Sequence, residues 1–380
     1  MQIPTEPIWV ESEQTLRELC QRWSTQAAIA VDTEFMRSDT YYPIAGLIQV
    51  GDGNGCYLID PVAIKDLSPL AELWRNENVV KVLHACSEDL EVFNVSMSAL
   101  PTPLFDTQIA AAFAGYGFSL GYANLAREML GVDIPKGETR SDWLARPLSV
   151  AQKKYAALDV AHLLIVYGKL LQALKQNNRL SWVQSDCEAL INNARTPLNP
   201  SLAYEKIGMG WKLAERSVAV LQLLAQWREC EARKRDLPRN RLLKEQPLFE
   251  MARRLPDSLS QLERIDGIPK RTLLDDGEQL LDIIAQGCAL PESELPARMT
   301  PPLGREYGAA MKQLKAWVKD RAEREAIPIE VLIRKKEYEQ IIRAVAAGQP
   351  ELPGRLNGWR AALFARDLLD VAQRQVEEVQ

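Results

Sequence analysis

The sequence has little histidine and no paired cysteines. His84 and His162 are its only histidines, and its six cysteines are scattered singly, without a C-x-x-C pair. This pattern excludes a zinc ribbon, an H-E-x-x-H zinc site and a disulfide framework, which all need closely spaced ligands or thiols. We therefore expect reduced thiols and a cytoplasmic protein. Any metal site would have to be built from carboxylates, which favour Mg²⁺ or Mn²⁺ over zinc.

Long hydrophobic runs and two common catalytic motifs are also absent. No segment approaches the ~18 consecutive apolar residues of a membrane span. The first twenty residues contain four glutamates and an arginine, which is unlike a signal peptide. Without a G-x-x-x-x-G-K-[ST] motif, an attached helicase or polymerase domain is not expected. The lack of a G-x-S-x-G motif argues against a Ser-His-Asp hydrolase.

The composition is typical of a globular chain with two or three domains, since 47% of the 380 residues are hydrophobic and 26% are charged. Short β-type runs at 28–35, 47–50, 56–59 and 79–83 alternate with helical patterns in the first half. Short connections between the first three runs predict antiparallel hairpins, whereas helices separate the later ones. The first half is therefore predicted to be an α/β domain with a mixed sheet.

Helical periodicity replaces strand signals after about residue 180 and continues to the C-terminus. A weak repeat with a period of 90 residues runs through this all-α half. Trp227 lies eleven residues before Pro238, and Trp317 lies eleven residues before Pro328. The repeat predicts two helical modules.

Proline-rich stretches predict the boundaries between these parts. The prolines between 291 and 302 cannot belong to a continuous helix and indicate a linker, and a second linker is expected at 197–210. The predicted domains are residues 1–195, 210–288 and 300–375.

Charge is distributed unevenly along the chain. The net charge is −5, and residues 1–200 carry 16 basic and 23 acidic side chains, against 30 and 28 in the remainder. The segment from Arg228 to Lys244 holds seven basic and three acidic residues. Such a segment could follow a phosphate backbone or simply form a solvated helix face.

Two acidic residues stand two apart in the first long β-type run. Asp32 and Glu34 therefore point to the same face of the strand. The flanking apolar residues indicate a buried strand, where neighbouring carboxylates are costly unless a cation neutralises them. A metal pair would do so, although an ordinary exposed acidic face remains the alternative for these two residues alone.

Three further residues extend this cluster. Asp89 follows the run at 79–83 at the start of a helical pattern, and Tyr155 and Asp159 lie one turn apart on a later helix that begins near Ser149. Each has a structural alternative, since Asp89 could merely favour the helix dipole and a Tyr/Asp pair is common. Four carboxylates and a phenol in this combination suit phosphodiester hydrolysis by two divalent ions.

The motifs together resemble those of ribonuclease D, a family within the DEDD superfamily of 3′→5′ exonucleases, over essentially the whole chain. Lys154 occupies the position where the histidine variant of the last motif has a histidine, so the tyrosine variant (DEDDy) is indicated. The helical modules resemble the HRDC domain, well at 210–288 and weakly at 300–375. The stretches that carry the resemblance are Asp32 to Phe35, Tyr41 to Pro43, Gly46 to Gln49, His84 to Leu90, Phe105 to Gln108, Ser141 to Leu148 and Tyr155 to Asp159.

The resemblance implies a ribonuclease-H-like exonuclease fold and a two-metal mechanism that releases nucleoside 5′-monophosphates. Asp32 would bridge both metals, Glu34 and Asp159 would complete one of them, and Asp89 would hold the other. Tyr155 would orient the attacking water. The implied substrates are RNAs with short 3′ extensions, such as tRNA precursors, whose 3′ ends would be matured, and we expect the protein to act as a monomer.

Substrate contacts are expected at several other positions. Phe35 and Met36 could pack against the terminal base or ribose, with core packing as the rival explanation for Phe35. Asp106 is expected to cap a helix, and His84 to be a core residue without a chemical role. Arg146 and Trp143, in the loop before Tyr155, could contact phosphate or anchor that loop. The proposed substrate-binding residues are Phe35, Met36, Gln49, Arg140, Arg233, Lys234, Arg235, Arg239 and Arg241.

Two other functions remain open at this stage. The first is a DNA 3′→5′ exonuclease, and the second is an inactive nucleic-acid-binding protein with the same fold. The intact set of acids argues against the second. We expect removal of residues 211–380 to spare hydrolysis of a short single strand and to weaken binding of tRNA-like RNA.

Overall fold

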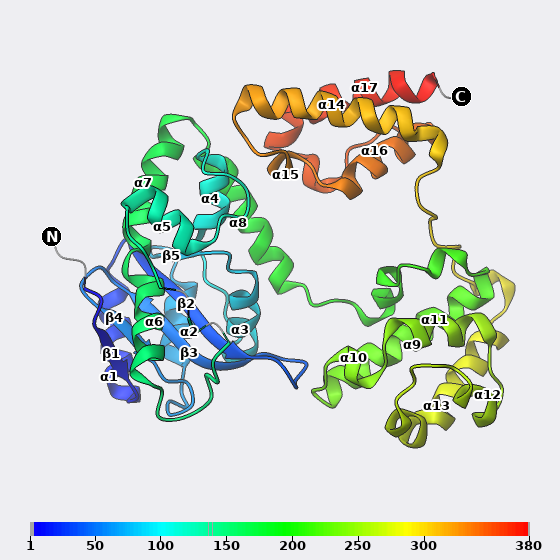
Figure 1. Ribbon diagram of the computed structural model, residues 1–380, viewed down its shortest axis with the longest axis horizontal. Coiled ribbons are helices and arrows are strands. Elements are labelled where there is room, and N and C mark those ends of the chain that lie inside the picture. The colour runs from blue at the N-terminus through cyan, green and yellow to red at the C-terminus, as the bar shows by residue number, and fades with distance from the viewer. Residues whose placement is uncertain (1–3, 136, 139, 379–380) are drawn as a thin grey trace. The chain divides into compact units, whose positions relative to one another are not determined.

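The computed structural model describes residues 4–135, 137–138 and 140–378, and Figure 1 shows its helices and strands. The chain divides into two compact units. Unit 1 contains the chain up to Met36, Ala45–Arg195 and the C-terminal part from Leu303. Unit 2 contains Arg37–Ile44 and Thr196–Pro302. Both units are therefore assembled from segments that are far apart in the sequence.

Unit 1 is built on a six-stranded mixed sheet with the strand order β1-β4-β3-β2-β5-β6. Strand β3 is antiparallel to β4, and the pairs β1–β4, β2–β5 and β5–β6 are parallel, which confirms the mixed sheet. The first strand was not predicted, because its four residues include a single buried side chain, Val10. The strands are β1 (Pro7–Val10), β2 (Ala28–Met36), β3 (Ile44–Gly51), β4 (Cys56–Ile59), β5 (Val80–Leu83) and β6 (Leu104–Asp106).

Helices cover the sheet and hold its apolar core. Trp23, Trp74 and Phe93 are among the largest side chains with almost no exposed surface. The helices of this part are α1 (Glu13–Trp23), α2 (Ser68–Arg75), α3 (Ser87–Met97), α4 (Thr107–Phe113), α5 (Tyr122–Leu130), α6 (Val150–Ala161), α7 (Leu163–Gln176) and α8 (Leu180–Arg195).

Helix α6 lies across the sheet, close to β2 and β4 (Figure 1). A capping box formed by Ser149 and Gln152 fixes its start, which agrees with the predicted beginning of the helix near Ser149. Close approach requires a small residue at Gly51 of β3, where a Cβ atom would lie 2.7 Å from the carbonyl oxygen of Val160. The cap sets where α6 begins, and the glycine allows α6 to pack closely against β3.

One helical stretch of the described residues, Val150–Gln176, is long and apolar enough to cross a membrane by length and composition. It comprises α6 and α7, and both helices pack against strands of the sheet. That packing accounts for its apolar side chains.

The C-terminal module belongs to the same compact unit as the sheet. Arg360 makes a bidentate ion pair with Asp186 of α8, at 2.8 and 2.6 Å. Trp359 stacks on Trp182 with 4.7 Å between ring centroids. Sequence patterns gave no sign of these contacts. The elements of this module are η4 (Arg305–Tyr307), α14 (Gly308–Glu325), α15 (Ile329–Leu332), α16 (Lys335–Ala346), η5 (Gly354–Leu356), a π-helical turn (Ala361–Ala365) and α17 (Arg366–Glu377).

Unit 2 is helical apart from the short segment Arg37–Ile44. The stretch at 197–210 is not a free linker, because a 3-10 helix forms at Pro200–Lys206 and the side chains of Ala203 and Ile207 are buried in the unit's core. Its elements are η1 (Pro200–Lys206), η2 (Gly210–Lys212), α9 (Glu215–Lys234), α10 (Arg239–Leu242), α11 (Glu245–Arg254), α12 (Leu259–Glu263), α13 (Lys270–Ala289) and η3 (Glu292–Glu294).

The predicted repeat is confirmed by these helices. Helix α10 begins at Arg239 and α15 begins at Ile329, which is 90 residues later. The ends of these two helices, at Leu242 and Leu332, are also 90 residues apart. Helices α11 and α16 begin at Glu245 and Lys335, again at the same spacing. The two helical modules therefore share a common order of elements in their first three helices.

Candidate active site

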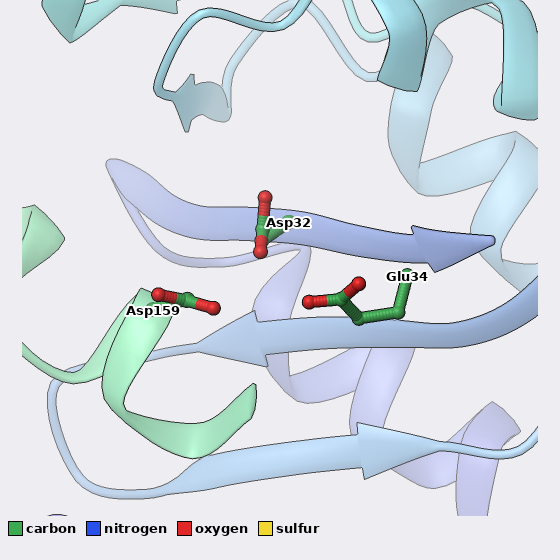
Figure 2. A group of neighbouring side chains, drawn as sticks. All are labelled: Asp32, Glu34 and Asp159. Carbon is green, nitrogen blue, oxygen red and sulfur yellow. The ribbon is translucent and has the colours of Figure 1, made fainter. Parts of the chain in front are cut away.

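Three predicted acids meet at one point of unit 1 (Figure 2). Asp32 and Glu34 extend from β2, and Asp159 extends toward them from α6. One carboxylate oxygen of each lies within 4.8 Å of the others, and all three side chains are half-buried. Two positions on one face of β2 and one position on α6 thus bring three carboxylate oxygens together. The spacing of Asp32 and Glu34 predicted that these two would share a face.

The fourth acid, Asp89, sits in the first turn of α3 and is 8% exposed. Its Oδ1 atom accepts a hydrogen bond from the hydroxyl group of Thr33, the residue between Asp32 and Glu34. This contact ties α3 to the strand that carries the other acids. Asp89 lines the same pocket as the three clustered carboxylates.

The four carboxyl groups have raised pKa values, chiefly because burial penalises their charged forms. Repulsion between neighbouring acids adds to the effect for Asp32 and Glu34. The pKa of Asp32 lies well above its usual range, and those of Glu34, Asp89 and Asp159 rise to about 9, about 6 and about 7. These acids offer only oxygen ligands, and their negative charges lie close together with little solvent to separate them. A hard divalent cation would fit such a site, because it would neutralise these charges.

Tyr155 lies one turn before Asp159 on α6, and its hydroxyl interacts with the Asp159 carboxylate. Burial raises the pKa of the Tyr155 phenol, and the nearby charges of Asp159 and Glu34 raise it further. The phenol therefore keeps its proton at neutral pH. It can donate a hydrogen bond, but it is a poor general base.

An open pocket of about 240 Å³ contains all five predicted catalytic residues. Phe35 also lines this pocket. Met36 is half-buried but is not part of the pocket lining. The lining consists of Asp32, Thr33, Glu34, Phe35, His84, Ala85, Glu88, Asp89, Tyr122, Tyr155, Asp159 and Leu163.

Sequence reasoning missed Tyr122 as a pocket residue. Its hydroxyl donates to the carbonyl oxygen of Leu158 at 3.3 Å, next to Asp159. No local pattern distinguishes this tyrosine, because α5 and α6 come together only through the fold. His84 also lines the pocket, but both of its ring nitrogens are engaged, with Thr107 and with the Leu120 carbonyl. Both ring nitrogens are therefore satisfied, as expected, but the side chain is half-buried at the pocket rather than in the core.

Asp106 caps helix α4, as predicted, by accepting from the backbone N–H groups of Gln108 and Ile109. It also accepts from the N–H groups of Ala85 and Cys86, just before Asp89. Asp106 thus supports the turn that leads into α3.

The prediction that Gln49 binds substrate is wrong. Its side chain lies within β3 and has no exposed surface, so a substrate cannot reach it. Arg146 pairs with Asp60 at 2.6 Å and donates to the Gly46 carbonyl, and Trp143 is buried, so both anchor the loop before α6. Arg140, by contrast, is exposed in that loop.

The basic segment of unit 2 is largely engaged internally. Arg233 and Arg239 pair with Glu229 at 2.8 and 2.5 Å, and Arg235 pairs with Asp276 at 2.5 Å. Arg241 pairs with Asp39. Lys234 differs from these arginines, because its side chain is 75% exposed and its one ion pair with a described residue is with Glu231, at 3.3 Å. Of the five residues of this segment that were predicted to bind RNA, Lys234 has the most exposed side chain.

Three known families match successive parts of the chain. A 3′-5′ exonuclease family matches residues 7–175 and therefore covers the sheet and all five pocket residues named above. The HRDC domain matches residues 217–284, and the C-terminal HRDC domain of ribonuclease D matches residues 305–368. The match to this exonuclease family implies that the chain uses divalent metal ions, in agreement with the cluster of acids in the pocket.

Known proteins of similar sequence match this chain over nearly its full length. Ribonuclease D of Pseudomonas paraeruginosa is 44% identical over 366 residues, which is 96% of this chain and 97% of that protein. Ribonuclease D of Escherichia coli (strain K12) is 38% identical over 367 residues, 96% of this chain and 98% of that protein. The crystal structure of Escherichia coli RNase D, described as an exoribonuclease involved in structured RNA processing, superposes with a TM-score of 0.91 at 37% identity over 97% of this chain and 99% of that one. The chain therefore belongs to the ribonuclease D family of 3′→5′ exoribonucleases.

Proposed function

We propose that Asp32, Glu34, Asp89 and Asp159 hold two divalent cations, Mg²⁺ or Mn²⁺, and that Tyr155 completes the active site. The observation that carries this proposal is the meeting of three half-buried carboxylates from two separate elements within 4.8 Å. A fourth carboxylate is linked to the same strand through Thr33. Oxygen-only ligands of this kind prefer hard cations over zinc.

The proposed reaction is hydrolysis of the last phosphodiester of an RNA strand, with release of a nucleoside 5′-monophosphate. Bound cations supply a more acidic water and charge stabilisation at the leaving oxygen. The phenol of Tyr155, which remains protonated, orients the attacking water by a hydrogen bond. Phe35, at the edge of the pocket, packs against the terminal base or ribose.

The proposed substrates are structured RNAs with short 3′ extensions, including tRNA precursors. Two observations support them: the Escherichia coli relative is described as processing structured RNA, and two HRDC modules accompany the exonuclease domain. Exposed Lys234 and Arg140 are proposed to contact phosphates. The protein is further proposed to act as a monomer in the cytoplasm.

The direct test is digestion of a 5′-labelled RNA with a short 3′ tail, alongside a DNA strand of the same sequence. We expect a ladder that shortens from the 3′ end of the RNA with Mg²⁺ or Mn²⁺ and stops with chelator. Faster digestion of the DNA would reassign the substrate. RNA binding without digestion under any metal would contradict the proposed active site.

Tyr155→Phe removes only the hydroxyl group that is proposed to orient water. We expect kcat to fall roughly a hundredfold, at the low end of what a positioned proton-transfer group contributes, since the phenol is not the base. The KM for a short RNA should stay within about twofold of the wild type. Steady-state kinetics with Tyr116→Phe as a control, a half-buried tyrosine outside the pocket lining, would check this.

Lys234→Ala tests the proposed phosphate contact in the HRDC module. Removing one phosphate contact should lower the slope of log K against log salt concentration by about 1 and weaken structured-RNA binding at low salt. Lys319→Ala, an exposed lysine on α14, serves as the control. An unchanged slope for Lys234→Ala would remove this residue from the RNA-binding surface.

A further inference from the structure

The segment Arg37–Ile44 connects β2 to β3 but belongs to unit 2. Strand β2 ends at Met36, so this segment begins only three residues after Glu34. Tyr41, in the middle of the segment, is 8% exposed and packs in the apolar cluster of unit 2. The end of the strand that carries two active-site acids is therefore continuous with a chain segment held by the first HRDC module.

The hydroxyl group of Tyr41 is fully hydrogen-bonded. It donates to Glu229 Oε1 at 2.5 Å and accepts from Arg239 Nη2 at 2.7 Å and from Arg233 Nε at 3.2 Å. The Arg239 guanidinium also lies 4.7 Å from the centre of the tyrosine ring, within cation–π range. One phenol thus connects three charged side chains of α9 and α10.

These charges compensate one another. Burial alone would raise the pKa of Glu229, but hydrogen bonds from Arg239 and Tyr41 and the charges of Arg239 and Arg233 lower it to about 2. Glu229 is therefore ionised, and the two arginines neutralise it. Because Arg233 and Arg239 neutralise Glu229 inside the module, their positive charge is not fully available to phosphate. The basic run in the sequence therefore forms only part of a phosphate-binding surface.

The backbone of the segment is held as well. The N–H groups of Tyr41 and Tyr42 both donate to Asp236 Oδ1, each at 3.0 Å. Arg37 donates from Nε and Nη2 to the Tyr41 carbonyl oxygen, at 3.1 and 2.9 Å, which closes the segment on itself. Arg241 adds an ion pair with Asp39. The segment is therefore held through the Tyr41 side chain, the backbone amides of Tyr41 and Tyr42, and the Tyr41 carbonyl oxygen.

We infer that Tyr41 is a positioning residue for hydrolysis: by fixing the segment after β2, it holds Glu34 and Phe35 in register with Asp159. The inference rests on the proposed active site. It gives the first HRDC module a second task, which is to support catalysis on any RNA, including one too short to need the module for binding. This differs from the sequence-based expectation that removal of the helical half spares hydrolysis of a short strand.

The first test compares Tyr41→Phe with Tyr42→Phe in the full-length protein. The Tyr41 variant loses only the hydroxyl contacts, and Tyr42 is a neighbouring tyrosine whose hydroxyl has no hydrogen-bond partner in the described part of the chain. On a short single-stranded RNA, we expect kcat of Tyr41→Phe to fall roughly tenfold with little change in KM, because small displacements of reacting groups are costly. Tyr42→Phe should match the wild type.

A second readout does not depend on turnover. If Glu34 loses its place, Mn²⁺ titrated calorimetrically should bind Tyr41→Phe several-fold more weakly than the wild type, whereas a purely structural role would leave metal affinity unchanged. Thermal unfolding reports whether each variant is folded.

A second pair of variants covers the case in which Tyr41→Phe does not fold. Asp236→Asn keeps an Oδ1 acceptor and tolerates the positive backbone φ of 48° at this position, so it should retain kcat, whereas Asp236→Ala should lose it. Unchanged kcat and Mn²⁺ affinity in folded Tyr41→Phe, or in folded Asp236→Ala, would overturn the inference. Failure of the wild type to digest RNA would instead overturn the proposed function.

Discussion

Asp32→Asn is expected to lower kcat roughly a thousandfold, because bound cations supply several kcal/mol of transition-state stabilisation. Asp32 lies among the other acids of the cluster, and burial together with the charges of Asp89, Asp159 and Glu34 raises its pKa. An amide of the same shape keeps the packing but removes the charge that a cation needs. Rapid-quench digestion of a 5′-labelled RNA would measure the effect.

The same substitution should stabilise the metal-free protein. Without a cation, burial of Asp32 beside the other acids costs free energy, because its carboxyl group must either keep its charge among them or take up a proton on folding. The neutral amide avoids this cost, so the substitution should raise Tm in chelator. Asp133→Asn, which changes an exposed acid paired with Arg127, serves as the control for both measurements. If Asp32→Asn lost activity and also unfolded at a lower temperature in chelator, loss of folding rather than of a metal ligand would explain the result.

In chelator, the stability of the protein should fall as the pH rises from about 5 to about 9. The carboxyl groups of Asp89, Asp159 and Glu34 have raised pKa values in the folded chain, at about 6, about 7 and about 9. A raised pKa means that the folded state holds its proton more tightly than the unfolded state. The resulting stabilisation is complete below the ordinary carboxyl range and is lost as the pH passes through the folded values.

Added Mg²⁺ or Mn²⁺ should suppress this decline, because a cation binds the deprotonated carboxylates of the folded state and stabilises it by mass action. Differential scanning calorimetry across this pH range, with chelator and with metal, would show two curves that separate as the pH rises. Glu34→Gln should flatten the chelator curve at its alkaline end. Identical curves with and without metal would contradict a cation site at these residues.

Much of the active site follows from local periodicity. Asp32 and Glu34 share a strand face because side chains alternate, and Tyr155 and Asp159 share a helix face because they are four residues apart. The predicted start of this helix near Ser149 was also correct. That Asp89 and Tyr122 join the same pocket depends on which elements pack together, and short-range patterns carry little information about packing.

The least predictable features depended on the partners of individual side chains. A glutamine in a β-type run can point toward solvent or into the core, and Gln49 proved to be buried. A basic run can bind phosphate or neutralise nearby acids, and the counter-charges of Arg235 and Arg239 lie 41 and 10 residues away along the chain. Asp276 lies far outside the basic segment, and although Glu229 lies within it, composition alone does not show which arginines it pairs with.

The contribution of the C-terminal module to unit 1 bears on how the protein is made. Arg360 and Asp186 are separated by 174 residues, so their pair, and the stacking of Trp359 on Trp182, can form only late in translation. A nascent chain that has emerged as far as α8 presents Phe113 and Trp182 without the indole that covers them. A ribosome-bound intermediate with exposed aromatic side chains is a natural client for chaperones, and messages truncated before α14 should yield aggregation-prone fragments.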